Sequence, residues 1–183
     1  VTPGTATVTY SLGTGCQVTA IVTVNAIPAA ITGIATVCAG STTSLADMTG
    51  GGTWTSAVPA TATVSGTGVV SGVTAGTVTI SYTSGVCPAT RVVTVNEAPS
   101  TITGPGTICT GLDGTFSNTV AGGTWTSSNT MVAPIGSASG IVTGGSPGIA
   151  TITYALGGGC NTTTSVSVTS GPDTITGPAT VCQ

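Results

Sequence analysis

The chain of 183 residues carries a formal net charge of −3, has no histidine, and contains Arg91 as its only basic residue. A single base cannot displace the counterions of a phosphate backbone, so the composition excludes a nucleic-acid partner. Only 3% of the residues are charged, but 39% are hydrophobic, which is enough to build a core and argues against disorder. Threonine and valine are abundant, and because β-branched residues favour strands over helices, we predict an all-β protein.

The apolar residues are scattered along the chain. No apolar run approaches the ~18 residues that a membrane helix needs, so we expect no membrane span. The N-terminus does not resemble a signal peptide. Because the sequence opens inside a strand-like pattern, we expect it to be part of a longer protein.

The sequence repeats itself with a spacing of 71 to 73 residues. Two short motifs recur, Ile-Thr-Gly and Gly-Thr-Trp-Thr-Ser. One tyrosine also recurs, as Tyr10, Tyr82 and Tyr154. Two cysteines recur in each repeat, one as Cys16, Cys87 and Cys160 and the other as Cys38, Cys109 and Cys182. The period predicts the tail of one repeat (1–28), two full repeats (29–100 and 101–172), and the first strand of another (173–183).

In the first full repeat, alternation and turn residues predict seven or eight short strands. We expect an edge strand interrupted near Gly33 and six further strands, over 30–38, 42–48, 53–55, 61–65, 68–72, 77–82 and 90–95. Short strands at this density are typical of an Ig-like β-sandwich. Threonine alternates with valine or isoleucine, so one face of each sheet should be dry and the other wet. A repeat this small has a thin core, which head-to-tail stacking and disulfides would reinforce.

The aromatic residues are predicted to be structural. Trp54 and Trp125 each lie between outward-facing threonines and should pack in the core. Tyr82 and Tyr154 end matching strands, where we expect their hydroxyls to bond to the backbone at a corner. The acids are isolated in sequence and no histidine can serve as a base, so we predict no enzyme activity, no cofactor and no metal site.

The six cysteines are predicted to form disulfides, which indicates an oxidising compartment. Two connectivities are open: pairs within repeats, Cys38–Cys87 and Cys109–Cys160, or a bond between repeats, Cys38–Cys160, with Cys16, Cys109 and Cys182 bonded to neighbouring repeats. Sandwich topology favours the second. It places Cys38 where the chain leaves a domain and Cys87 where it enters, and a seven-residue strand spans ~23 Å against the ~7 Å that bonded Cα atoms tolerate.

The sequence also resembles a known family. The runs 123–129 (Gly-Thr-Trp-Thr-Ser-Ser-Asn), 140–144 (Gly-Ile-Val-Thr-Gly) and 148–154 (Gly-Ile-Ala-Thr-Ile-Thr-Tyr) look like the bacterial Ig-like repeat (group 2), and 76–82 follows the same frame. The variant with Thr-Val-Cys near the front and Gly-Cys near the back is similar to repeats of giant surface proteins of Bacteroidetes. The resemblance implies secreted arrays, often exported by the type IX route, that serve as adhesins, stalks or filaments.

Two short motifs predict covalent glycans. Asp173-Thr174-Ile175 resembles the O-glycosylation motif used across Bacteroidetes, with Thr174 as the acceptor, and Asn161-Thr162-Thr163 matches the N-glycosylation sequon. The alternative for each is an unmodified residue in a turn.

These observations predict a structural repeat module of an extracellular filament or cell-surface stalk, stapled by disulfides and glycosylated. Its partners would be neighbouring repeats or copies of itself in a fibre. The alternative is a ligand- or glycan-binding adhesin repeat.

Overall fold

The computed structural model describes residues 2–172 and Gly177. These residues are almost all in strands and loops, with no α-helix among them. No helix among the described residues is long and apolar enough to cross a bilayer. The chain divides into two compact units, Val1–Glu97 and Ala98–Gln183.

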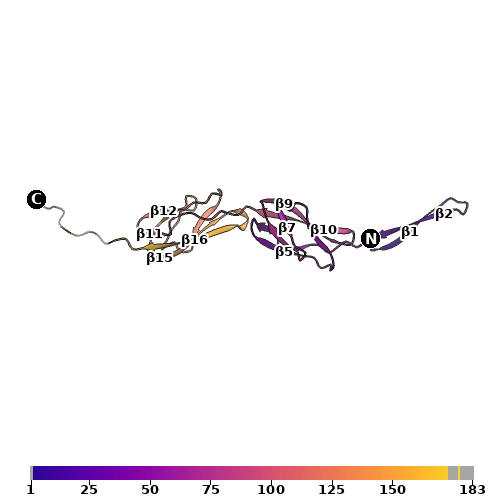
Figure 1. Ribbon diagram of the computed structural model, residues 1–183, viewed down its shortest axis with the longest axis horizontal. Helices are drawn as coiled ribbons and strands as arrows, with labels where there is room; N and C mark the ends of the chain where they lie inside the picture. The colour runs from indigo at the N-terminus through magenta and orange to yellow at the C-terminus, as the bar shows by residue number, and fades with distance from the viewer. Residues whose placement is uncertain (1, 173–176, 178–183) are drawn as a thin grey trace. The chain divides into compact units, whose positions relative to one another are not determined.

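The first unit begins with a two-stranded ribbon, β1 (Gly4–Ser11) and β2 (Gln17–Val24), which pair antiparallel (Figure 1). The rest of the unit is a β-sandwich of eight strands, called here the first sandwich: β3 (Thr32–Gly33), β4 (Thr36–Cys38), β5 (Thr42–Ala46), β6 (Thr53–Ser56), β7 (Ala62–Val64), β8 (Val69–Gly72), β9 (Gly76–Ser84) and β10 (Cys87–Asn96). One sheet has the order β4-β10-β9-β6 and the other the order β3-β5-β8-β7. The predicted break near Gly33 is the point where the edge strand changes sheets.

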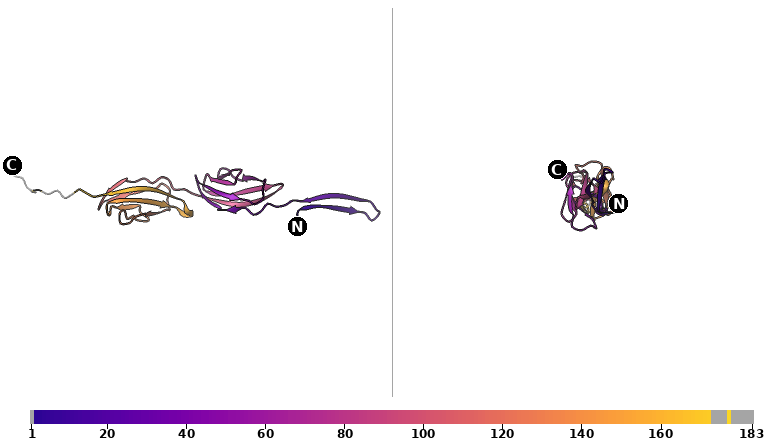
Figure 2. Two further views of the ribbon diagram at one scale, coloured as in Figure 1. Left: turned by 90° about the horizontal axis from the view of Figure 1, so that it is seen from below. Right: turned by 90° about the vertical axis from the view of Figure 1, so that its right-hand side faces the viewer.

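The second unit contains the second sandwich: β11 (Thr107–Cys109), β12 (Asp113–Thr115), β13 (Thr124–Ser127), β14 (Ile141–Thr143), β15 (Gly148–Ala155), a 3-10 turn η1 (Gly157–Gly159) and β16 (Asn161–Thr169). Its larger sheet has the order β11-β16-β15-β13, which matches β4-β10-β9-β6 strand for strand. The opposite layer consists of β12 and β14 with isolated bridges at either side. Figure 2 shows the two layers of strands within each sandwich.

Each core forms where alternating strand residues turn inward. In β9, Val78, Ile80 and Tyr82 are buried, and they pack with Leu45 and Val70 of the opposite sheet. The second core repeats this plan, with Ala150, Ile152 and Tyr154 from β15 packed with Phe116 and Val142. The alternation of threonine with aliphatic residues thus gives each sheet one apolar face, as the sequence predicts.

The strands of the first sandwich differ from the predicted bounds mainly at their ends. The strand expected over 42–48 stops at Ala46, because the Asp47 carboxylate accepts a hydrogen bond from the Thr49 N–H (2.7 Å) and starts a turn. The last strand begins at Cys87, three residues before the expected start, because it pairs with β9 down to the turn after Ser84.

Candidate functional site

The cysteines of each sandwich lie at the two ends of one sheet, β4-β10-β9-β6 in the first and β11-β16-β15-β13 in the second. Cys38 ends β4 and is paired in register with Asn96, the last residue of β10, whereas Cys87 is the first residue of that strand. At about 3.3 Å per residue, β10 separates the two cysteines by roughly 30 Å. A disulfide needs Cα atoms within ~7 Å, so the alternative pairing Cys38–Cys87 is incompatible with the fold.

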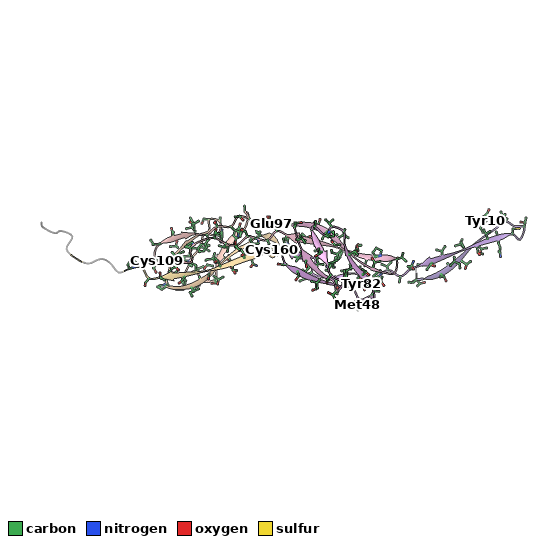
Figure 3. The ribbon with its side chains drawn as sticks, viewed as in Figure 1. Tyr10, Met48, Tyr82, Glu97, Cys109 and Cys160 are labelled. Atoms are coloured by element: carbon green, nitrogen blue, oxygen red, sulfur yellow. The ribbon has the colours of Figure 1, made fainter. Side chains whose placement is uncertain are left out.

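The second sandwich has the same arrangement. Cys109 is paired with Thr169 at the end of β16, and Cys160 immediately precedes that strand (Figure 3). The alternative pairing Cys109–Cys160 is therefore excluded by the same separation. Among the described cysteines, Cys16, Cys87 and Cys109 have free thiols, whereas Cys38 and Cys160 are each disulfide-bonded. Cys182 lies outside the described residues.

The matching tyrosines close a corner in each sandwich. The Tyr82 hydroxyl donates to the Thr49 carbonyl and accepts from the Gly52 N–H (2.8 Å). The Tyr154 hydroxyl donates to the Val120 carbonyl (2.7 Å) and accepts from the Gly123 N–H (2.8 Å). Each hydroxyl satisfies two backbone groups of the loop that precedes the tryptophan strand.

Each tyrosine ring also packs on the tryptophan of the neighbouring strand. Trp54 and Tyr82 have ring centroids 4.8 Å apart, and Trp125 and Tyr154 have centroids 4.5 Å apart, both in tilted geometry. Trp125 and Tyr154 are buried, and Trp54 is half-buried against the first core. Trp125 and the two tyrosines belong to the cores, whereas Trp54 packs against the first core and also lines a surface hollow of about 360 Å³.

The outward faces of the sheets β4-β10-β9-β6 and β11-β16-β15-β13 carry rows of hydroxyl groups. Registered strands place threonines and serines side by side, in the rows Thr36–Thr94–Thr77, Thr55–Ser81–Thr90 and Thr126–Thr153–Thr163. Arg91 adds no charge to these faces, because it alternates to the inward side of β10 together with Ala89 and Val93, and its guanidinium donates to the carbonyls of Ile31 (2.7 Å) and Gly33 (2.9 Å). These outward faces are therefore uncharged and mostly polar, with Val92 (59% exposed) and Ile149 (72% exposed) as apolar exceptions.

Sequence reasoning did not foresee this function of Arg91. Its acceptors lie 60 and 58 residues away in the chain, on the segment where the edge strand changes sheets. The guanidinium thereby joins β10, in one sheet, to β3, in the other. The presence of a single base in a nearly uncharged repeat could have indicated that Arg91 has a structural function, but the sequence does not reveal which carbonyls it binds.

The predicted glycosylation residues differ in what the structure describes. Asn161 is exposed at the first position of β16, and Thr163 of its sequon is exposed two residues later. Thr174 lies outside the described residues. Across the described part of the chain, no three His, Cys, Asp or Glu side chains gather as a potential metal site.

Comparisons with known proteins agree with this architecture. Residues 35–96 match the family model of the bacterial Ig-like domain (group 2). A search of curated proteins found no match. Among solved structures, the C-terminal 282-residue fragment of intimin, in complex with the intimin-binding domain of its translocated receptor, is 17% identical with a TM-score of 0.50, covering 78% of this chain and 64% of that chain.

Two further structures have lower TM-scores. The S-layer protein rSbsC(31-844) is 21% identical with a TM-score of 0.36 over 88% of this chain, and extracellular domains 3–5 of Drosophila OTK are 10% identical with a TM-score of 0.40 over 91% of it. The alignments span 31% of the S-layer chain and 70% of the OTK chain. The chain therefore has an all-β, Ig-like fold, and its residues 35–96 are similar to the group 2 bacterial Ig-like domain.

Proposed function

We propose that this chain is a structural repeat module of an extracellular filament or cell-surface stalk. The observation that carries the proposal is the recurrence of one sandwich with the same hairpin register: Val78 pairs with Val93 in the first sandwich as Ala150 pairs with Val166 in the second. Repeats of this kind suit an array, in which each unit interacts chiefly with its neighbours. The hydroxyl-lined outer faces suit a surface that is covered by glycans or by other copies.

A disulfide between Cys38 and Cys160 would staple neighbouring repeats. The fold supports this pairing because the partner of each cysteine within its own repeat lies roughly 30 Å away along one strand. Both cysteines are disulfide-bonded, and the other described cysteines are free. If each repeat is linked to the next in this way, Cys16, Cys109 and Cys182 would bond to neighbouring repeats. Cys87, which belongs to the Cys16 series, would do the same.

Mass spectrometry of the full chain under non-reducing conditions tests the staple. After oxidation in a glutathione buffer, proteolysis should release a linked peptide that contains Cys38 and Cys160. The variant Cys38→Ser should lose that peptide and expose the Cys160 thiol to alkylation, whereas the control Cys87→Ser should leave the peptide intact. A linked peptide that contains Cys38 and Cys87 would contradict the staple.

Glycans at Thr174 and Asn161 complete the proposal. The exposure of Asn161 and Thr163 supports access of a glycosyltransferase to the sequon. Intact-mass measurement of the protein from its native source should exceed the mass of the bare polypeptide, and the excess should fall in Thr174→Ala and Asn161→Gln. A mass equal to the bare chain would exclude modification at both residues.

The filament also has to be distinguished from a glycan-binding adhesin. A hollow of about 280 Å³ in the second sandwich is lined partly by Phe116, Trp125 and Tyr154. Their exposed fractions are only 2%, 5% and 4%, so these rings offer little surface for stacking on a sugar. Electron microscopy of the native material should show uniform fibres with an axial repeat of one or two sandwich lengths; isolated stalks that end in a distinct head would favour the adhesin.

A further inference from the structure

The ribbon β1–β2 is a third copy of the central hairpin of each sandwich. Its register pairs Ala6 with Val22, Val8 with Ala20 and Tyr10 with Val18. The pairs at the matching positions of the first sandwich are Val78 with Val93, Ile80 with Arg91 and Tyr82 with Ala89. The ribbon therefore has the strand pairing of a repeat hairpin, with an aliphatic residue and a tyrosine at the same inward positions.

The two settings differ in exposure. Val8 is 56% exposed, Tyr10 65% and Val22 48%. Their counterparts in the first sandwich are Ile80 (0%), Tyr82 (6%) and Val93 (0%), and those in the second are Ile152 (0%), Tyr154 (4%) and Val166 (0%). Because strand residues alternate between faces, Val8, Tyr10 and Val22 form one apolar face of the ribbon, and Figure 3 shows Tyr10 near its turn.

The two sandwiches show what covers such a face. Leu45 and Val70 of the opposite sheet join the cluster that contains Ile80 and Val93, and Trp54 packs on Tyr82. At the sheet edge, β4 runs parallel to the end of β10, where the Thr94 N–H donates to the Ala35 carbonyl (2.9 Å). All of these groups come from residues 29–72, the front part of the repeat.

We propose that the apolar face of β1–β2 is a docking surface for the front part of another Ig-like repeat, a segment patterned like residues 29–72 of this chain. Its tryptophan would pack on Tyr10, its aliphatic residues on Val8 and Val22, and its Thr-Val-Cys strand along Thr23–Asn25. Residues 1–28 contain no charged side chain and residues 29–72 contain only Asp47, so the two surfaces match in polarity. This inference rests on the proposed function as a repeat array.

The test is a chain extended at its N-terminus by a second copy of residues 29–72. Val1 aligns with Val73, so the fusion restores the spacing of a full repeat. Amide hydrogen exchange should then show protection of the Thr23 N–H, the counterpart of the Thr94 donor, increased about 100-fold over the original chain. If the Thr23 amide exchanges equally fast in both chains, the proposal is wrong.

Two variants of the extended chain provide a matched comparison. Val8→Asp places a charge on the inward face and should abolish the added protection, whereas Thr9→Asp, on the outward face, should preserve it. The amides of Ile80 and Ile152 should stay protected in both variants, which shows that the complete sandwiches remain folded. Equal effects of the two substitutions would overturn the assignment of the face.

Two further readouts separate this proposal from its rivals. If the original chain forms a dimer in light scattering and buries Tyr10 without the extension, a second ribbon is the occupant and the proposal is wrong. In the extended chain, the added copy of Cys38 should bond to Cys87, with oxidised glutathione accepting the two electrons and two protons of the thiols. Protection of Thr23 without that bond would support docking and contradict the inter-repeat staple.

Discussion

Each sandwich has one sheet of the same design, and the two sandwiches differ in the sheet that packs against it. The sheets β4-β10-β9-β6 and β11-β16-β15-β13 have the same order and matched registers, and each contains a Trp–Tyr pair. Opposite them, the first sandwich has four strands, whereas the second has β12 and β14 with isolated bridges. Pro134 occupies the position of Thr63, which pairs with Ser71 in the first sandwich. Because proline has no N–H to donate, the counterpart of β7 is reduced to a bridge between Ile135 and Val142.

The sandwiches also anchor their front segments with different polar groups. In the first, Arg91 binds the carbonyls of Ile31 and Gly33; its counterpart in the second is Thr164. In the second, Asn118 binds Ser100 in both directions, accepting from its hydroxyl (3.0 Å) and donating to its carbonyl (2.6 Å). The shared sheet thus defines the repeat, while the attachment of the front segment can be achieved with different side chains.

The largest expected effect comes from a feature that both sandwiches share. Gly68 and Gly140 have φ of +82° and +68°, and an added Cβ would overlap the carbonyl of Leu45 or Phe116 and crowd the adjacent tryptophan. Gly68→Ala and Gly140→Ala should each lower the free energy of unfolding of their own sandwich by about 2–5 kcal/mol, since strain and overpacking add. Urea unfolding followed by tryptophan fluorescence, with the other tryptophan replaced by phenylalanine, measures each sandwich separately.

Gly111→Ala is the matched control for these glycines. Gly111 also has a positive φ (+81°) but no atom lies within 4 Å of its added Cβ, so the variant should lose only about 1–2 kcal/mol. An equal loss in Gly140→Ala and Gly111→Ala would show that the close approach to Phe116 contributes nothing.

An intermediate effect is expected from Arg91→Thr, which places the residue of the second sandwich into the first. The loss of two hydrogen bonds from a charged donor should destabilise the first sandwich by about 1–3 kcal/mol and leave the second unchanged. The same fluorescence measurement checks this, with Thr164→Ser as a control that should change little. An unchanged first sandwich would show that Arg91 does not anchor the edge segment.

The smallest effect should be a gain in stability from Asp47→Asn. The Oδ2 atom of Asp47 is buried and has no hydrogen-bond partner, whereas the side-chain NH₂ of its counterpart Asn118 donates to the Ser100 carbonyl. An amide at position 47 could donate to the Ala29 carbonyl, the matching acceptor, and should stabilise the first sandwich by about 1 kcal/mol. The reverse change, Asn118→Asp, should destabilise the second sandwich. If both substitutions stabilise their sandwich, or both destabilise it, this account is wrong.

Much of the fold could be predicted from local pattern. The break near Gly33, the strands of β9 and β10 and the inward tryptophans follow from alternation, because side chains in a strand point to opposite faces in turn. The sequence contains Pro134, but it does not show which strand that residue would have paired with. The loss of the counterpart of β7 in the second sandwich could therefore not be predicted. The sites at Thr174 and Cys182 lie outside the described residues and stay predictions.

The sequence by itself determined the period, the all-β class and which residues of each strand face inward, since these depend on residues close together in the chain. The tertiary structure decided which distant groups meet. The parallel pairing of β4 with β10 places Cys38 beside Asn96 and roughly 30 Å from Cys87, and the change of sheets near Gly33 brings two carbonyls to Arg91. Such contacts depend on strand order and register, which local alternation does not specify.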